Sequence, residues 1–96
     1  MNSVPNIPLF SCGRIVATPG ALALLEEANK SASEFLSRHL RGDWGELCQE
    51  DKAENDLSLK HGFRLLSSYP ITGTANLWII TEADRSVTTL LLSSEY

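Results

Sequence analysis

Apolar residues in the first half of the chain recur every three or four positions, which is the period of a helix with one buried face. Thr18 and Pro19 give the first start signal. The threonine hydroxyl can accept a free N–H of the first turn, and proline at the first helical position loses no hydrogen bond. The face predicted to be buried comprises Ala21, Leu24, Leu25 and Ala28. A first helix is therefore expected directly after Thr18.

A second helix is expected to run from Ser31 to about Leu40. Ser31 and Glu34 have the spacing of a capping box, in which each residue satisfies a free N–H at the start of the helix. Gly42 can adopt the left-handed conformation that ends a helix. The predicted buried stripe is Phe35, Leu36, His39 and Leu40.

A third helix is expected from about Asp51 to His61. Asp51 can cap its first turn, and Gly62 can stop it in the way that glycine commonly ends helices. Ala53 and Leu57 are predicted to lie on its packed side. Most other positions are charged or polar, so the polar face of this helix is wide.

The second half of the chain changes to an alternation with a period of two, which is typical of strands. Strands are expected at 63–69, 77–82 and 87–92, with turns at 72–74 and 83–86. These runs predict a three-stranded antiparallel meander. The short β-branched run at 13–18 can add a fourth strand at an edge.

The expected fold class is α+β, with two to three N-terminal helices packed on a three- or four-stranded antiparallel meander. Residues 1–12 are predicted to form an extended N-terminal arm, and residues 13–96 a single α+β domain of a size that supports one core. The middle strand has apolar residues on both faces and needs cover on both. An exposed Trp78 or Ile80 would therefore indicate a dimer.

Composition excludes several classes of protein. With 96 residues and 43% apolar residues, the chain resembles an ordinary globular domain. Its longest apolar runs, 21–25 and 90–92, are far shorter than the roughly 20 residues of a membrane span. Residues 1–13 lack the positive charge and the apolar helix of a signal peptide. We therefore expect a cytoplasmic protein in which Cys12 and Cys48 are free thiols.

Charge is distributed unevenly along the chain. The 8 basic residues are scattered, which disfavours direct nucleic-acid binding, because neutralising phosphates requires a clustered positive surface. The 12 acidic residues outnumber them, giving a formal net charge of −4. Half of these acids gather in one segment, namely Asp43, Glu46, Glu50, Asp51, Glu54 and Asp56, with Lys52 as the only basic residue among them. A protein partner with a basic surface is therefore expected.

Five polar residues are candidates for catalysis or ligand binding: His39, Asp43, Asp51, Asn55 and Arg85. A histidine and carboxylates close in sequence can form a general base with an orienting partner. The same residues also have a structural interpretation, in which His39 completes an apolar stripe, Asp43 makes an Asx turn and Asp51 caps a helix. No residue is assigned as catalytic on this pattern alone.

The candidate binding surface combines the acidic segment with Trp44 and the polar corner at 81–86. It comprises Asp43, Trp44, Glu46, Glu50, Asp51, Glu82, Asp84 and Arg85. Aromatic anchors carry much of the binding energy of interfaces, so Trp44 and Trp78 are contacts to test. The corner is equally compatible with a polar turn in which Asp84 bonds its own backbone and Arg85 pairs with a nearby acid.

No metal site and no cofactor are predicted. His39, Cys48 and His61 are metal-ligand residue types, but their spacing matches no zinc pattern with paired short-range ligands. Cys48 lies in an acidic segment, which does not supply the electropositive setting that activates a thiolate. The glycines form no phosphate-binding loop.

Several pieces of the chain carry a family resemblance. They are GRIVATPGAL (13–22), RHLRGDWGEL (38–47) with its HxxGDWG motif, the spaced Asp51 and Asn55, GFRLLSSY (62–69) and WIITEADRSVTTLLLSSEY (78–96). As a set they resemble a group of short proteins encoded largely on bacterial plasmids, phages and other mobile elements. The resemblance implies no agreed catalytic activity. It implies a small accessory protein, for which countering host defences such as CRISPR or restriction systems is a recurring role.

Three functional hypotheses follow. The leading one is a small acidic binding protein of mobile-element type that inhibits or modulates a host defence or DNA-handling system by protein–protein contact, as anti-CRISPR and anti-restriction proteins do. The second is a small enzyme or ligand-binding domain whose five candidate polar side chains converge on one pocket. The third is an antitoxin-like regulatory homodimer, which requires a large apolar two-fold interface.

Overall fold

The computed structural model describes residues 8–96, which form three α-helices and a four-stranded mixed sheet. The elements in chain order are β1 (Arg14–Ala17), α1 (Pro19–Glu27), α2 (Ala32–Leu40), α3 (Gln49–His61), β2 (Leu65–Pro70), β3 (Asn76–Thr81), β4 (Val87–Leu92) and the 3-10 helix η1 (Ser93–Glu95). The predicted α+β class is confirmed. Of the predicted N-terminal arm, residues 1–7 lie outside the described residues.

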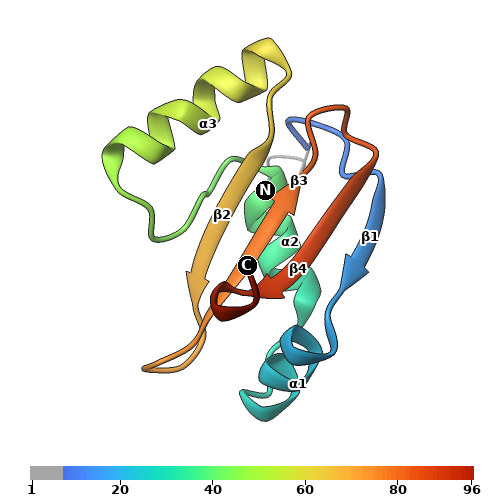
Figure 1. Cartoon of the computed structure of the whole chain (residues 1–96), viewed down its shortest axis with the longest axis vertical. Helices are drawn as coiled ribbons and strands as arrows, with labels where there is room; N and C mark the ends of the chain where they lie inside the picture. Colours follow the sequence, from blue (N-terminus) through green and yellow to red (C-terminus); the bar gives the residue numbers. More distant parts are fainter. Residues whose placement is uncertain (1–7) are drawn as a thin grey trace, which may run out of the picture.

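The strands lie in the order β1-β4-β3-β2 (Figure 1). β2, β3 and β4 form the predicted antiparallel meander, in which Ile79 lies between Ser67 and Leu90. β1 occupies the far edge but runs parallel to β4, with Ile15 opposite Thr88. The predicted three-stranded antiparallel meander is therefore confirmed, whereas the fourth strand at its edge is parallel and not antiparallel. A parallel pair needs a long crossover, and the helices and the β2–β3 hairpin supply it.

Three predicted helix signals lie at observed helix ends: Thr18, Ser31 and Gly62. Thr18 Oγ1 accepts the N–H of Ala21 at 3.1 Å at the start of α1. Ser31 Oγ caps α2 by accepting the N–H of Ser33 at 3.2 Å, instead of the N–H of Glu34 that the predicted capping box requires. Gly62 ends α3 with a φ of 76°. These boundaries depend on bonds between near neighbours in sequence, which is why local patterns reveal them.

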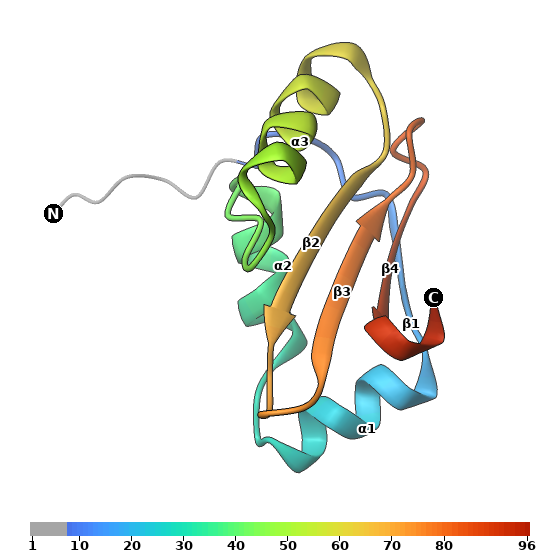
Figure 2. The same ribbon diagram turned by 60° about the vertical axis from the view of Figure 1, so that its left-hand side comes forward.

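Two predictions about α3 were wrong. The helix begins before Asp51, which lies in its first turn instead of capping it. The packed side of α3 holds Asn55 and Ser58, whereas Ala53 and Leu57 are exposed. The reason is the position of the helix: α3 lies along the outer edge of β2 (Figures 1 and 2), where it meets main-chain polar groups of the strand. Polar side chains are therefore the ones turned inward.

The core lies between α1, α2 and one face of the sheet, which we call the helix face and which carries Leu77, Ile79 and Thr81 of β3 (Figure 2). Its apolar cluster comprises Ala21, Leu25, Phe35, Tyr69, Leu77, Ile79 and Leu90. α1 and α2 supply the first three members and the strands the others. As predicted, the first two helices form the cover of the sheet.

The opposite face, which we call the C-terminal face, carries Trp78 and Ile80 of β3 and is covered by the C-terminus (Figure 2). The Trp78 ring lies 5.3 Å from the ring of Tyr96. Ile80 is buried and Trp78 is half-buried. Within residues 8–96 this face therefore does not show the exposed Trp78 or Ile80 that would have indicated a dimer.

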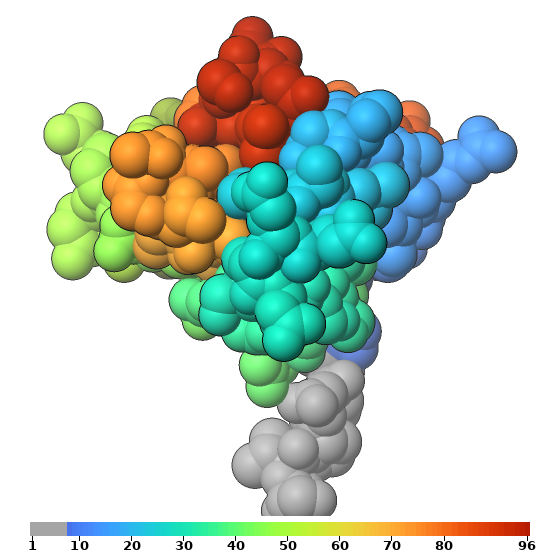
Figure 3. Space-filling model, turned by 90° about the horizontal axis from the view of Figure 1, so that it is seen from below, coloured from blue at the N-terminus to red at the C-terminus, as the bar shows by residue number. Residues whose placement is uncertain are grey.

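The C-terminal residues lie beside the start of α1 (Figure 3). Glu95 Oε1 accepts the N–H of Leu92 at 2.8 Å and the hydroxyl of Thr18 at 2.7 Å. These two hydrogen bonds lower the pKa of Glu95, because they stabilise its charged form. Thr18 therefore caps α1 and holds the C-terminus with the same hydroxyl.

Candidate functional site

His39 of α2 is fully buried against the rings of Phe10 and Trp44. Its Nδ1 lies 2.5 Å from Ser67 Oγ, and its Nε2 lies 2.9 Å from Thr81 Oγ1. Burial, and then the positive charge of Arg85, lower its pKa to about 4. His39 is therefore a neutral core residue at neutral pH.

A chain of hydroxyl groups determines the tautomer of His39. The hydroxyl of Thr88 donates to the carbonyl of Cys12 at 2.7 Å, so Thr88 Oγ1 accepts from Thr81 Oγ1, which lies 2.7 Å away. The proton of Thr81 is then used, and Nε2 of His39 must donate to Thr81. Nδ1 accepts from Ser67. Both ring nitrogens are thus occupied within the core, which matches the structural interpretation of His39.

The connection after α2 is held by hydrogen bonds of Asp43 and Trp44. Asp43 Oδ1 accepts the N–H of Gly45 at 3.2 Å, as in an Asx turn. Its Oδ2 accepts from Arg38 Nε at 2.7 Å, and this bond lowers the pKa of Asp43. Trp44 is 4% exposed, and its Nε1–H donates to Asp56 Oδ1 at 3.2 Å. Trp44 therefore does not provide the surface anchor that the sequence predicts.

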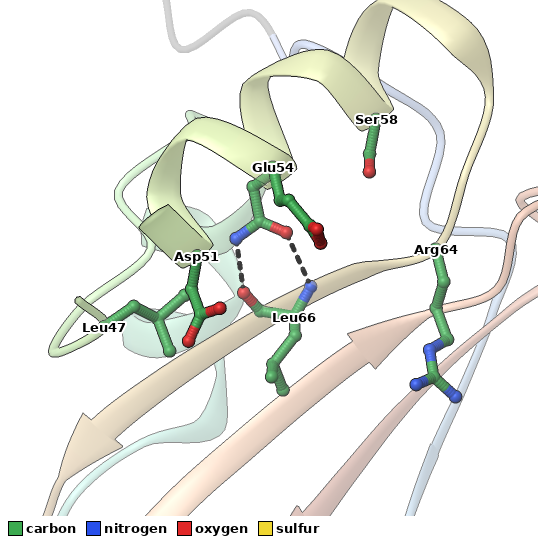
Figure 4. Close-up of a pocket in the computed structure, with 7 residues that line it drawn as sticks. Leu47, Asp51, Glu54, Ser58, Arg64 and Leu66 are labelled. Carbon is green, nitrogen blue, oxygen red and sulfur yellow. Dashed lines mark hydrogen bonds between the residues drawn. The ribbon is translucent and has the colours of Figure 1, made fainter. Parts of the chain in front are cut away.

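The outer edge of β2 is closed by side-chain and main-chain groups of the preceding segments. Ser68 exchanges main-chain hydrogen bonds of 2.7 and 3.0 Å with the segment 44–46. Gly45 has a φ of 77°, and a Cβ there would collide with the carbonyl of Ser68. The amide of Asn55 exchanges two bonds with the main chain of Leu66, at 2.6 and 3.1 Å (Figure 4). Asn55 thus acts as a substitute for a neighbouring strand.

Arg85 joins the β3–β4 turn to the end of α3. Its Nη1 donates to the carbonyl of Phe63 at 2.7 Å, and its Nη2 donates to the carbonyl of Ser58 at 3.1 Å. The guanidinium also lies 5.6 Å from the ring centre of Phe10. Arg85 therefore donates to main-chain carbonyls, whereas the turn interpretation predicts a pair with a nearby carboxylate. The reason is that the carbonyls at the C-terminal end of a helix attract a cation.

The five candidate polar residues do not line a common cavity within residues 8–96. Asp51 and Asn55 line the same cavity between α3 and β2. His39 lies in the core, Asp43 on the surface after α2, and Arg85 at the β3–β4 turn. The structure therefore brings two of the five together and leaves three apart.

The cavity between α3 and β2 has a volume of about 190 Å³ (Figure 4). It is lined by Leu47, Asp51, Glu54, Asn55, Ser58, Arg64 and Leu66. A second hollow of about 480 Å³ shares Glu54, Ser58 and Arg64 with it and adds Leu57, His61 and Phe63. We call the two together the α3 groove.

The α3 groove combines acidic and apolar side chains. Asp51 and Glu54 extend from α3 toward β2, while the guanidinium of Arg64 points away from them along the sheet (Figure 4). Leu57 is 55% exposed and Phe63 is 61% exposed. The groove therefore offers carboxylates and uncovered apolar surface side by side.

The predicted binding residues divide between the α3 region and the β3–β4 turn. Glu46, Glu50 and Asp51 are exposed before and within the first turn of α3. Glu82 is half-buried, and Asp84 is exposed and accepts the N–H of Ser86 at its own turn, at 3.0 Å, as predicted. Two hydrogen bonds from Ser86 lower the pKa of Asp84, and the one from the Ser86 side chain has a larger effect than the one from its N–H.

Sequence reasoning missed the wall of the groove formed by Leu57, Phe63 and Arg64. The signal was present, because α3 has no apolar stripe and a leucine on such a helix has no core to enter. Phe63, an apolar residue directly after the helix stop, is a second signal for an exposed apolar surface. The sequence pattern instead predicts Leu57 on the packed side of its helix and Phe63 at the start of a strand.

Within residues 8–96, no group of histidine, cysteine and acidic residues is arranged to hold a metal ion. In the same part of the chain, each helix is too short or too polar to cross a bilayer. Cys12 is half-buried and Cys48 is exposed, and both are free thiols. Comparisons with family models, with curated proteins and with solved structures find no match.

Proposed function

We propose that this protein is a binding protein that holds a basic segment of a partner protein in the α3 groove. The observation that carries the proposal is the juxtaposition of two carboxylates of α3, Asp51 and Glu54, with two exposed apolar side chains, Leu57 of α3 and Phe63 directly after the helix stop. Lysine or arginine side chains of the partner would pair with the carboxylates. An apolar side chain of the same segment would cover Leu57 and Phe63.

The way in which α3 is attached supports this role. Asn55, Asp56 and the carbonyl of Ser58 bind the body of the protein through hydrogen bonds. Leu57 is not needed for that attachment, since most of its surface is in solvent. Uncovered apolar residues next to a polar rim are typical of protein-binding surfaces.

The charge of the chain supports a basic partner. Glu50, Asp51 and Glu54 lie in the first half of α3, and the formal net charge is −4. A surface of one sign accelerates the encounter with a surface of the opposite sign, and this effect weakens as salt rises. We expect association that is fastest at low ionic strength.

The family resemblance suggests which partners to test first. A small acidic protein that occupies a basic nucleic-acid-binding surface would inhibit a defence or DNA-handling complex without any catalytic step. We therefore propose CRISPR and restriction complexes as partners, and mobile elements as the genetic setting. A gene position next to phage, plasmid or defence genes would support this assignment. An enzymatic function has no comparable support, since only Asp51 and Asn55 of its five residues share a cavity.

Co-elution with purified CRISPR and restriction complexes at low and moderate salt tests the proposal. We expect the Asp51→Lys/Glu54→Lys variant to lose the complex. The matched control is Glu26→Lys/Glu27→Lys, which makes the same change of charge at exposed positions of α1 and should retain it. Equal loss in both variants would show that total charge and not the groove is responsible. No complex with any of these partners at low salt would overturn the proposal.

A further inference from the structure

The two edges of the sheet differ in their main-chain hydrogen bonds. The edge at β2 is closed, whereas β1 forms the opposite rim with no described segment beyond it (Figure 1). The N–H groups of Arg14 and Thr18 donate toward β4 at 2.9 Å. Because the main-chain N–H and C=O groups of successive residues in a strand point to opposite sides, those of Ile15 and Ala17 face outward, away from β4.

The side chains of β1 leave this edge accessible. Ile15 is 49% exposed and Val16 is 39% exposed, on opposite faces of the sheet. Both are β-branched residues, which favour a strand neighbour. An open edge with such side chains is a template for pairing with another strand, and natural sheets usually block it with charges, bulges or proline, or cover it with a helix or loop. β2 has such protection, and Ile15 and Val16 provide none.

We propose that β1 pairs antiparallel with β1 of a second copy of this chain, with Val16 facing its own counterpart on the two-fold axis. In this register Ile15 lies opposite Ala17 of the partner subunit, and the two exchange both main-chain hydrogen bonds. A register shifted by two residues would instead pair Ala17 with Gly13, or Ile15 with Pro19. Gly13 has a φ of 62°, outside the strand region, and Pro19 has no N–H to donate, so both shifted registers lose hydrogen bonds.

Charge complementarity favours a second copy over an unrelated strand. Arg14, Val16 and Thr18 share the C-terminal face, so Arg14 lies opposite Thr18 of the partner subunit in the proposed register. The Thr18 hydroxyl is bound to the carboxylate of Glu95 at 2.7 Å. Arg14 therefore meets a carboxylate across the interface, and the symmetry repeats the pair. Within residues 8–96 Arg14 forms no salt bridge of its own.

The proposed dimer joins two four-stranded sheets into one continuous sheet. Its contact is short, since β1 spans 4 residues. It buries less than the roughly 1,200 Å² of a standard stable interface, so we expect a monomer–dimer equilibrium that depends on protein concentration. This surface lies at the opposite edge of the sheet from the α3 groove, and its test does not depend on the proposed partner.

Sedimentation velocity over a range of concentrations tests the dimer. Ile15→Pro removes an outward N–H but leaves the bonds to β4, and we expect it to weaken the dimer at least about tenfold. Arg14→Glu places a carboxylate opposite Glu95 of the partner subunit and should weaken dimerisation, most strongly at low salt. Lys30→Glu makes the same charge change at an exposed position away from β1 and should not. Unchanged circular dichroism would confirm that the variants fold.

Disulfide trapping tests the register independently. In a Cys12→Ser/Cys48→Ser background, Val16→Cys brings two thiols together on the axis at a separation that a disulfide spans. We expect rapid oxidation to a covalent dimer, whereas Ala23→Cys, exposed on α1, should cross-link slowly. A wild-type chain that is monomeric at millimolar concentration, or equal cross-linking of the two variants, would overturn the proposal.

Discussion

α2 and α3 are attached to the same sheet by opposite means. α2 places Phe35 in the apolar cluster and packs on the helix face. α3 lies at the edge of β2, and its buried residues, Asn55 and Ser58, are both polar. Burial of apolar surface is non-directional and grows with area, whereas a hydrogen bond requires one geometry and contributes about 1 kcal/mol.

This difference separates the stabilising part of the molecule from the part available for binding. A helix held by apolar burial must turn its large side chains inward, as α2 does. A helix held by hydrogen bonds keeps its apolar residues free, and Leu57 is accordingly in solvent. Four predictions test this division, from the largest expected effect on stability to the smallest.

Truncation of the α2 contact should have the largest effect. Phe35 is buried and its ring lies 5.4 Å from the ring of Tyr69. We expect Phe35→Ala to lower the free energy of unfolding by about 3–5 kcal/mol, since it removes apolar burial and leaves a cavity. Urea denaturation followed by circular dichroism measures this loss. A loss below about 1 kcal/mol would contradict the central role of α2 in the core.

Acid should destabilise the fold through His39. Its pKa falls from 6.5 to about 4 on folding, so the unfolded chain binds a proton at a pH where the folded chain does not. The stabilisation that comes from the lowered pKa of His39 is fully present above pH 6.5. As the pH falls toward about 4, the free energy of unfolding decreases by roughly 3 kcal/mol.

The pH dependence of urea denaturation between pH 7 and about 4 checks this expectation. His39→Gln should flatten the slope, because glutamine does not titrate. His61→Gln, at an exposed position, is the matched control and should leave the slope unchanged. A slope that survives in His39→Gln would assign the acid sensitivity to other groups. Asp43, whose pKa is lowered, titrates below this window.

Removal of the Asn55 amide should release α3 locally. We expect Asn55→Ala to cost about 1–3 kcal/mol, since it leaves the main chain of Leu66 without its partner at the edge of β2. Hydrogen exchange should become faster at the Leu66 amide and stay unchanged at Leu90 in the core. Glu54→Ala, at the exposed preceding position, is the control. Equal acceleration at Leu66 and Leu90 would indicate global unfolding instead.

Removal of the Leu57 side chain should have the smallest effect on stability. We expect Leu57→Ser to change the free energy of unfolding by no more than about 0.5 kcal/mol, because most of the side chain is already in solvent. The same variant should weaken binding of the proposed partner. Thermal denaturation and co-elution, measured on one preparation, check both expectations. A loss of stability similar to that of Phe35→Ala would remove the distinction between the two helices.

The elements that local signals specify were predicted closely. β4 has the expected bounds, 87–92, because alternation and flanking turn residues mark it. Thr18, Ser31 and Gly62 end helices where predicted, although Ser31 bonds to Ser33 and not to Glu34, because a cap bonds to residues a few positions away. Contacts between distant segments follow no such rule. The buried network from His39 to Thr88 joins residues 49 positions apart.

The candidate site was predicted only in part. Asp51 was recognised as a candidate and lines the α3 groove, but Leu57 was assigned to the packed side of its helix. Periodicity shows that α3 has no apolar stripe, but it does not show which polar side of the helix turns inward. Trp44 was expected on a surface, yet Phe10 and His39 enclose it.

The sequence by itself determined the α+β class, the helix ends at Thr18, Ser31 and Gly62, and the antiparallel meander, since each depends on neighbours within a few residues or on a simple period. Only the tertiary structure decided that β1 runs parallel to β4, that Asn55 closes the edge of β2, and that Leu57 stays in solvent. Each of these depends on which surface a segment meets. That choice depends on the free energy of the whole assembled chain and not on local propensity.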